Sequence, residues 1–160
     1  SWMGLLFYLA AYLFMNVGAF AALLAVRKDD GGECAELDDL AGIGSRHPWV
    51  AACLAACLLS LAGFPPTAGF LAKFFVFGAA VREGWTWLVA IAAAATLISA
   101  FYYLRVIVVM YMTEAEHATA VDPENRALYF VLFLCALAVF VLGLLPGNVL
   151  LLVRRAAGAP

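Results

Sequence analysis

Residues 63–69 read Gly-Phe-Pro-Pro-Thr-Ala-Gly and interrupt a long apolar run over 49–81. As one straight helix, the 33 residues of this run would measure about 50 Å, well beyond the roughly 30 Å hydrocarbon core of a bilayer. Two consecutive prolines remove two backbone donors and clash with the preceding turn. The flanking glycines tolerate the unusual backbone dihedrals that follow. The sequence therefore predicts a helix over 49–81 that is broken at Gly63, Pro65, Pro66 and Gly69.

The composition places most of this chain in lipid. Of its 160 residues, 67% are apolar and only 12% are charged, and the mean hydropathy is +1.01. A soluble domain is about half apolar and about a quarter charged. The net charge of −2 excludes a basic surface for nucleic acid. We therefore expect an all-α integral membrane protein that contacts the lipid bilayer and no nucleic acid.

Three further apolar runs are long enough to cross a bilayer. With the broken helix they give four predicted transmembrane helices, the second of them discontinuous, in a single membrane-embedded unit over 1–160. The fourth helix has no internal charge and is predicted to be a peripheral, lipid-facing span. Because the first residues enter an apolar helix without a basic leader, we expect the chain to be a piece of a longer protein. The other three runs are 3–26, 85–112 and 127–153.

The distribution of Lys and Arg near the ends of the spans predicts the orientation. A small excess of basic residues places the two long polar segments, 27–48 and 113–126, in the cytoplasm. The basic residues of that side are Arg27, Lys28, Arg46, Arg105 and Arg126, and those of the opposite side are Arg82, Arg154 and Arg155.

Lys73 is the candidate functional residue. It lies nine residues before the polar end of the run at Arg82, or about 13–14 Å of helix, and a lysine stem reaches only part of that distance. An ionisable group at this depth costs several kcal/mol unless it is partnered or hydrated, and broken membrane helices mark ion or substrate sites. Lys73 is therefore the predicted proton relay. The alternative is a structural pair with an acid from a helix outside this chain.

Two other predicted helices carry sets of polar residues that either line a hydrated path beside Lys73 or hold helices together by hydrogen bonds. The set in 3–26 is Tyr8, Tyr12 and Asn16, and for it helix packing is the favoured interpretation. For the set in 85–112 both interpretations stay open. That set is Thr96, Ser99, Tyr102, Tyr103 and Arg105.

No pattern in the sequence predicts a metal or a bound cofactor. There is no glycine-rich phosphate loop and no pair of cysteines with the CxxC spacing. Cys53 and Cys57 lie one helical turn apart, but no histidine or carboxylate is near enough in sequence to complete a site. We therefore expect them to act as small apolar filler.

Four stretches of this sequence resemble a known membrane family. They are similar to the C-terminal third of the N-type subunit (subunit N) of bacterial proton-translocating NADH–quinone oxidoreductase, or respiratory complex I. That subunit belongs to an antiporter-like family shared with multisubunit Na⁺/H⁺ antiporters and membrane-bound hydrogenases. The resemblance covers nearly all of residues 2–112 and fades in the last helix. The stretches are YLFMNVGAFAAL, LAGIGSRHPWVA, LLSLAGFPPTAGFLAKFFVF and ISAFYYLRVIVVMYM.

This resemblance implies that the chain supplies helices eleven to fourteen of a fourteen-helix subunit of the bacterial inner membrane. Lys73 matches the helix-twelve lysine of the family, which is part of a mid-membrane chain of charged residues used in proton translocation. The other essential charged residues of the family are absent, so this piece should not pump by itself. Its partners would be the other membrane subunits of the complex.

The resemblance also implies a non-redox subunit of a translocase, with no complete active site. NADH, FMN, iron–sulfur clusters and quinone would bind in other subunits, and this chain would hold no cofactor. One alternative is a subunit of a multisubunit Na⁺/H⁺ antiporter or a membrane-bound hydrogenase, with H⁺ or Na⁺ as the coupled ion. Another is a membrane scaffold in which Lys73 only pairs with an acid.

Overall fold

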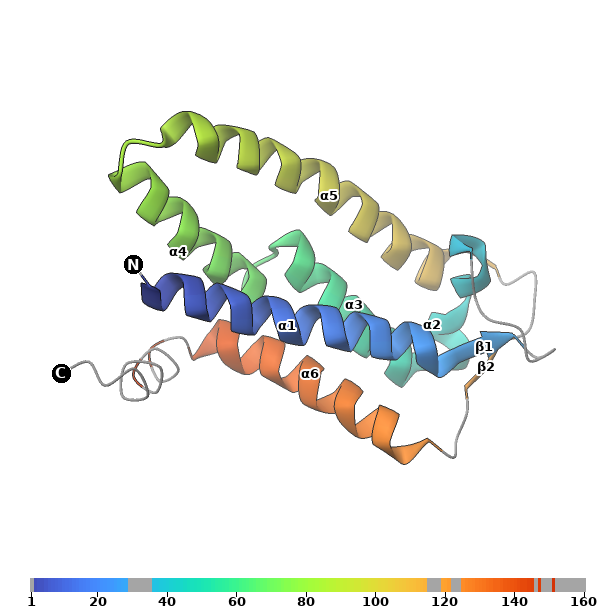
Figure 1. Cartoon of the computed structure of the whole chain (residues 1–160). Coiled ribbons are helices and arrows are strands. Elements are labelled where there is room, and N and C mark those ends of the chain that lie inside the picture. Colours follow the sequence, from blue (N-terminus) through green and yellow to red (C-terminus); the bar gives the residue numbers. More distant parts are fainter. Residues whose placement is uncertain are drawn as a thin grey trace.

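The computed structural model describes residues 2–28, 36–114, 119–121, 125–145, 147 and 151. In this part of the chain, long helices lie side by side in one elongated bundle (Figure 1). The elements in chain order are α1 (Trp2–Ala25), β1 (Val26–Lys28), the 3₁₀ helix η1 (Leu37–Leu40), α2 (Ile43–Arg46), α3 (Pro48–Ala62), α4 (Ala68–Arg82), α5 (Thr86–Met112), β2 (Thr119–Val121) and α6 (Arg126–Leu144).

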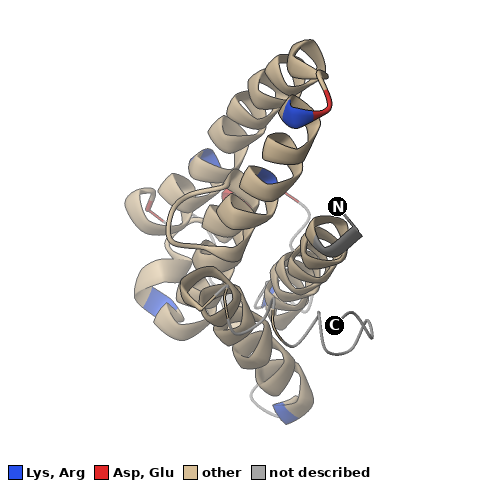
Figure 2. Cartoon of the chain, turned by 90° about the vertical axis from the view of Figure 1, so that its left-hand side faces the viewer, with Lys and Arg blue, Asp and Glu red and all other residues tan. Residues whose placement is uncertain are grey.

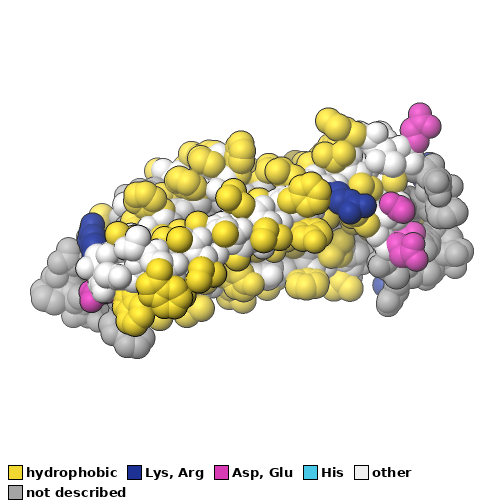
Figure 3. Space-filling view, turned by 90° about the horizontal axis from the view of Figure 1, so that it is seen from above, with side chains coloured by type: hydrophobic (Ala, Val, Ile, Leu, Met, Phe, Trp, Pro, Cys, Tyr) yellow, Lys and Arg dark blue, Asp and Glu magenta, His cyan; other side chains and the backbone are white. Residues whose placement is uncertain are grey.

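Three of the described helices are long and apolar enough to cross a membrane: Gly4–Ala25 within α1, α5 and α6. Helices α3 and α4 have 15 residues each, about 22 Å, which is shorter than the roughly 30 Å core of a bilayer. Figure 3 shows hydrophobic side chains over the long middle of one face and charged side chains toward its ends. Viewed along the bundle, charged residues are sparse on the helices (Figure 2). The expected mostly helical membrane architecture is confirmed.

Helix α1 is the element around which α3, α4 and α6 pack. Gly18 lies so close to two of these helices that a Cβ there would come within 2.6 Å of Cys57 Sγ and 2.8 Å of Cys135 Cβ. Phe7, near the start of α1, packs edge-on against Phe75 of α4, with 5.7 Å between the ring centroids. Helix α3 therefore lies against the C-terminal half of α1, and α4 against its N-terminal half.

In the described part of this chain α5 is the least buried of the long helices, whereas the sequence pointed to the last helix as the peripheral one. In α5 none of the most apolar 18-residue window is buried, whereas a third of the corresponding window of α6 is buried. Leu132, Cys135 and Val139 of α6 are all buried in the bundle. The prediction was wrong because an uncharged helix suits a lipid-facing and a helix-facing position equally well, since both surroundings are apolar.

The polar segments at one end of the bundle contain a short two-stranded ribbon that an all-α prediction missed. Strands β1 and β2 pair antiparallel, with Val26 opposite Val121 and Arg27 opposite Ala120. Three-residue strands are too short to show a period of two in the sequence. The pairing brings the described parts of 27–48 and 113–126 together, close to η1 and α2 (Figure 1).

The last helix is shorter than predicted. Helix α6 ends at Leu144, whereas the sequence suggested a helix over 127–153. Pro146 disfavours a helical conformation at the residue before it, and Leu145 has φ −121° and ψ 51°. Residues 148–150 and 152–160, with Arg154 and Arg155, lie outside the described residues, as does Cys34.

Candidate functional site

The candidate site is the junction between α3 and α4, where the chain over 49–81 forms two helices in place of one. Helix α3 ends at Ala62, and Gly63 adopts a left-handed conformation with φ 84° and ψ 38°. The N–H groups of Gly63 and Phe64 donate to the carbonyl oxygens of Ser60 and Leu59, both at 3.0 Å. This pair of bonds is the Schellman arrangement that closes many helices at a glycine.

Gly69 serves the junction through its lack of a side chain. It lies in the first turn of α4, and the glycines with positive φ in the described chain are Gly42, Gly63 and Gly84. The expectation that Gly69 supplies unusual dihedrals was therefore wrong. A Cβ at Gly69 would overlap the carbonyl oxygen of Ser60 and lie 3.0 Å from Met15 Sδ. The first turn of α4 thus lies directly against the last turn of α3.

Ser60 of α3 caps the start of α4. Its side chain is fully buried, its Oγ accepts a hydrogen bond from the Gly69 N–H at 3.0 Å, and it donates to Met15 Sδ at 2.8 Å. Thr67, the residue in the N-cap position of α4, donates its hydroxyl to the Phe64 carbonyl oxygen at 2.6 Å and makes no capping bond. N–H groups in the first turn of a helix lack partners within the helix. Ser60 therefore takes the role that a local N-cap residue usually has.

Lys73 of α4 caps the end of α3 in return. Its Nζ donates a hydrogen bond to the carbonyl oxygen of Leu61 at 2.8 Å, and the side chain is half-buried. Side chains on a helix lean toward its N-terminus, so Lys73 reaches back over the first turn of α4. The last carbonyl groups of a helix lack partners and carry the negative end of its dipole. A lysine ammonium is therefore stabilised at this position.

The junction lies at the middle of the bundle. Met15, which Ser60 contacts, is near the midpoint of α1, a helix of 24 residues and about 36 Å. Helices α1, α3, α4, α5 and α6 contain no Asp or Glu. The hydrogen-bond partner of Lys73 in this structure is thus a backbone carbonyl, and the described helices place no carboxylate at that depth.

Helix α6 packs against the other side of the junction through Gly143. A Cβ at this position would overlap the Pro66 carbonyl oxygen and lie 2.7 Å from the carbonyl carbon of Thr67. The sequence interpretation missed Ser60, Met15 and Gly143. A single serine in the last turn of an apolar helix could have pointed to Ser60, but nothing local distinguishes Gly143 from other glycines.

The polar residues predicted on α5 are not brought together with Lys73 by the contacts in the described structure. Thr96 and Ser99 donate to carbonyl oxygens four residues earlier in the same helix, at 2.8 and 2.9 Å. Tyr102 and Arg105 are exposed, and Tyr103 is half-buried against the core. The contacts of Thr96 and Ser99 are therefore internal to α5.

The polar set on α1 also makes contacts within its own helix. The rings of Tyr8 and Tyr12 stack with 5.7 Å between their centroids, and Asn16 Nδ2 donates to the Tyr12 carbonyl oxygen at 2.8 Å. Tyr8 and Tyr103 of α5 are both partly buried against the same hydrophobic core. The contacts of the α1 set fit the interpretation that these residues serve helix packing.

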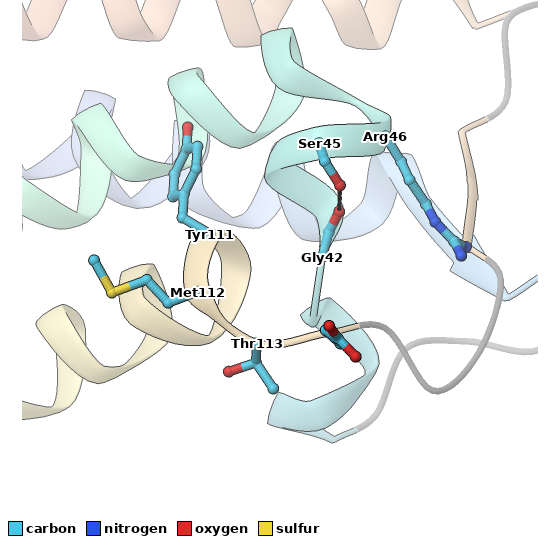
Figure 4. Close-up of a pocket in the computed structure, with 7 residues that line it drawn as sticks. Gly42, Ser45, Arg46, Tyr111, Met112 and Thr113 are labelled. Atoms are coloured by element: carbon cyan, nitrogen blue, oxygen red, sulfur yellow. Dashed lines mark hydrogen bonds between the residues drawn. The ribbon is translucent and has the colours of Figure 1, made fainter.

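A separate cavity of about 310 Å³ lies at the end of the bundle that carries the strands (Figure 4). Figure 4 shows Tyr111 and Met112 at the end of α5, and Ser45 on α2 with its hydroxyl bonded to the Gly42 carbonyl oxygen. None of the lining residues belongs to the α3–α4 junction. They are Gly42, Ser45, Arg46, Tyr111, Met112, Thr113 and Glu114. Among the residues that the structure describes, no group of three or more His, Cys, Asp or Glu side chains could hold a metal ion.

Comparisons with known proteins match most of this chain. The family described as NADH:quinone oxidoreductase/Mrp antiporter, TM, matches residues 1–99. NADH-quinone oxidoreductase subunit N 2 of Roseiflexus castenholzii is 46% identical over 153 residues, which are 95% of this chain and 30% of that protein. Subunit N 1 of Solibacter usitatus is 44% identical over 153 residues, covering 95% of this chain and 31% of that protein.

A solved structure shares the fold. It is the respiratory complex I from Thermus thermophilus with bound aureothin, with a TM-score of 0.81 and 30% sequence identity. The match covers 92% of this chain and 33% of the chain it matches. The present chain thus spans about a third of the length of these relatives. These findings confirm the resemblance that the four sequence stretches carry.

Proposed function

Because this chain belongs to the NADH:quinone oxidoreductase/Mrp antiporter transmembrane family, we propose that it is part of the membrane arm of a proton-translocating NADH–quinone oxidoreductase. The names of the relatives and of the solved complex support this choice within the family. In this proposal the chain carries no complete active site, and the redox cofactors and quinone bind in other subunits. Its partners are the other subunits of the complex in the bacterial inner membrane.

We further propose that the chain crosses the membrane four times, with α3 and α4 together forming one discontinuous crossing. Two contacts support this. Gly18 faces Cys57 of α3, and Phe7 packs on Phe75 of α4, so the two short helices follow successive halves of α1. Non-helical backbone at membrane depth is tolerated where protein surrounds it, and Gly143 of α6 covers this junction. The segments 27–48 and 113–126 then face the cytoplasm.

The proposed proton relay is Lys73, and its hydrogen bond to Leu61 is the observation that carries this proposal. A lysine ammonium paired with a carboxylate leaves an uncompensated buried anion when it loses its proton, which is strongly destabilising. A carbonyl oxygen is a neutral acceptor, and an amine still has N–H groups to donate. Lys73 can therefore gain and lose a proton while it keeps the contact that positions it. The proposed path also includes Thr96, Ser99, Tyr102, Tyr103 and Arg105 of α5, although no contact in the described structure joins them to Lys73.

The test compares Lys73→Met with Arg82→Met in the complete complex. Both changes remove a cation from α4, but Arg82 is exposed at the end of the helix and takes no part in the junction. Proton pumping is measured in inside-out vesicles, together with electron transfer from NADH to quinone. We expect Lys73→Met to impair pumping and Arg82→Met to leave it unchanged. Equal pumping by Lys73→Met and the unaltered complex would exclude the relay.

A second candidate function is an ion-exchange subunit of an Mrp-type antiporter, because the description of the matching family includes that class. An antiporter exchanges Na⁺ for H⁺ across the membrane without any redox enzyme. Purification of the complex that contains this chain distinguishes the two. NADH–quinone activity in the purified complex supports the first function, whereas Na⁺/H⁺ exchange without that activity supports the second.

A further inference from the structure

We infer that Ser60 is a positioning residue that fixes where the Lys73 ammonium lies, an inference that rests on the proposed relay role of Lys73. Ser60 and Leu61 are consecutive residues in the last turn of α3, and each bonds to α4. Ser60 Oγ accepts from the Gly69 N–H at 3.0 Å, and the Leu61 carbonyl oxygen accepts from Lys73 Nζ at 2.8 Å. The two halves of the junction thus cap one another.

The two bonds differ in how firmly they hold α4 in position. Gly69 and Lys73 are four residues apart, one turn of the same helix, and therefore lie on one face of α4. The bond to Gly69 engages a backbone N–H and so sets the rotation and the height of α4 itself. The bond to Lys73 engages the end of a flexible four-carbon stem, which can follow small displacements of the helix. The rigid contact at Ser60 is therefore the one that determines where the backbone of Lys73 lies.

Met15 of α1 sets the direction of the Ser60 hydroxyl. A hydroxyl group has one proton to donate, and in this structure that proton goes to Met15 Sδ at 2.8 Å. The lone pairs of Oγ are thereby left free for the Gly69 N–H. Without the sulfur, a serine hydroxyl within a helix commonly turns to a carbonyl oxygen in the preceding turn. Ser60 is fully buried, so both bonds are shielded from solvent in this structure.

The primary variant is Ser60→Ala in the complete complex, with Ser45→Ala as the matched control. Ser45 donates its hydroxyl to the Gly42 carbonyl oxygen, at an exposed position on α2 away from the junction. We expect Ser60→Ala to lower proton pumping by about two- to tenfold, the range that corresponds to one net hydrogen bond, and to move the pH profile of pumping. Ser45→Ala should change neither quantity. Wild-type pumping with an unmoved pH profile in Ser60→Ala would overturn the inference.

A double variant shows whether Ser60 acts through Lys73. If it does, Ser60→Ala combined with Lys73→Met pumps no less than Lys73→Met alone, because the positioned group is already absent. A further loss in the double variant would show that Ser60 acts on pumping by another route, against the inference. If Ser60→Ala prevents assembly, Met15→Leu replaces it in both tests. That change conserves volume and removes only the sulfur that orients the Ser60 hydroxyl.

A structural readout separates failure of this inference from failure of the proposed function. In a cryo-electron microscopy map of the Ser60→Ala complex, we expect the Lys73 side chain to be displaced from the Leu61 carbonyl oxygen. An unchanged Lys73 would overturn the inference whatever the pumping result. A different outcome would be wild-type pumping by Lys73→Met together with a displaced lysine in the Ser60→Ala map. That outcome would exclude the relay role of Lys73 and keep the positioning role of Ser60.

Discussion

Lys73 and Leu61 are twelve residues apart in the chain, yet Lys73 Nζ donates a hydrogen bond to the Leu61 carbonyl oxygen at 2.8 Å. The bond spans the junction between α3 and α4 and gives an otherwise unpartnered carbonyl group of α3 a donor. Lys73 therefore has a structural role that does not depend on proton transfer. The proposed relay adds a second role at the same atom, and the two roles predict different effects of one substitution.

Lys73→Arg distinguishes the two roles. A guanidinium group can still donate to the Leu61 carbonyl oxygen, but it stays protonated and cannot pass a proton on. We therefore expect the Arg variant to insert and assemble normally and to show impaired proton pumping in inside-out vesicles, as Lys73→Met does. Full pumping by the Arg variant, with loss only in the Met variant, would show that the cap alone is needed.

Gly69→Ala is expected to destabilise the junction. The new Cβ would overlap the Ser60 carbonyl oxygen, which is backbone and cannot rotate away. Crowding of this kind costs about 1–3 kcal/mol, more than the roughly 1 kcal/mol by which alanine favours a helix over glycine. The matched control is Gly78→Ala in the same helix, where a Cβ meets nothing within 4 Å. Thermal unfolding of the purified complexes should show a lower midpoint for Gly69→Ala alone, and equal midpoints would contradict the close packing.

Gly143→Ala tests whether α6 supports the same junction from the other side. Its Cβ would overlap the Pro66 carbonyl oxygen, so α6 must move away from the segment between α3 and α4. We expect a reduced amount of assembled subunit in membranes, measured by quantitative immunoblotting. Gly78→Ala again serves as the control. Normal assembly of Gly143→Ala would indicate that α6 does not hold this segment in place.

The end of α3 could be predicted from sequence because its cause is local. Gly63 followed by Pro65 and Pro66 stops a helix whatever surrounds it. The caps across the junction could not be predicted in the same way. Ser60 and Met15 are 45 residues apart, and their contact exists only after α1 and α3 have packed together. Gly69 was identified, but for its backbone freedom, whereas the structure uses its small size.

The positions of the last two helices show a second limit of sequence reasoning. The pattern of apolar residues in a sequence separates a membrane helix from a loop, because water and lipid differ strongly in polarity. It does not separate lipid from the interior of a helix bundle, because both are apolar. Leu132 of α6 and Leu97 of α5 both belong to helices apolar enough to cross a membrane, yet Leu132 is buried and Leu97 is 73% exposed. The assignment of α6 to the periphery failed for this reason. The proposal for the path residues on α5 likewise depends on whether their helix face meets lipid or another helix.

Single-cysteine labelling can test the number of crossings and the orientation of the chain together. Glu36 precedes η1 and Glu83 follows α4, so the discontinuous pair α3 and α4 separates them along the chain. If α3 and α4 form one crossing, the two positions face opposite sides of the membrane. In a Cys34→Ser background, a membrane-impermeant maleimide should label Glu36→Cys only in inside-out vesicles and Glu83→Cys only in right-side-out vesicles. Cys53, Cys57 and Cys135 remain in place because all three are buried. Reversed labelling would keep the crossing and overturn the cytoplasmic assignment of 27–48, whereas labelling of both positions from one side would show that α3 and α4 do not cross the membrane together.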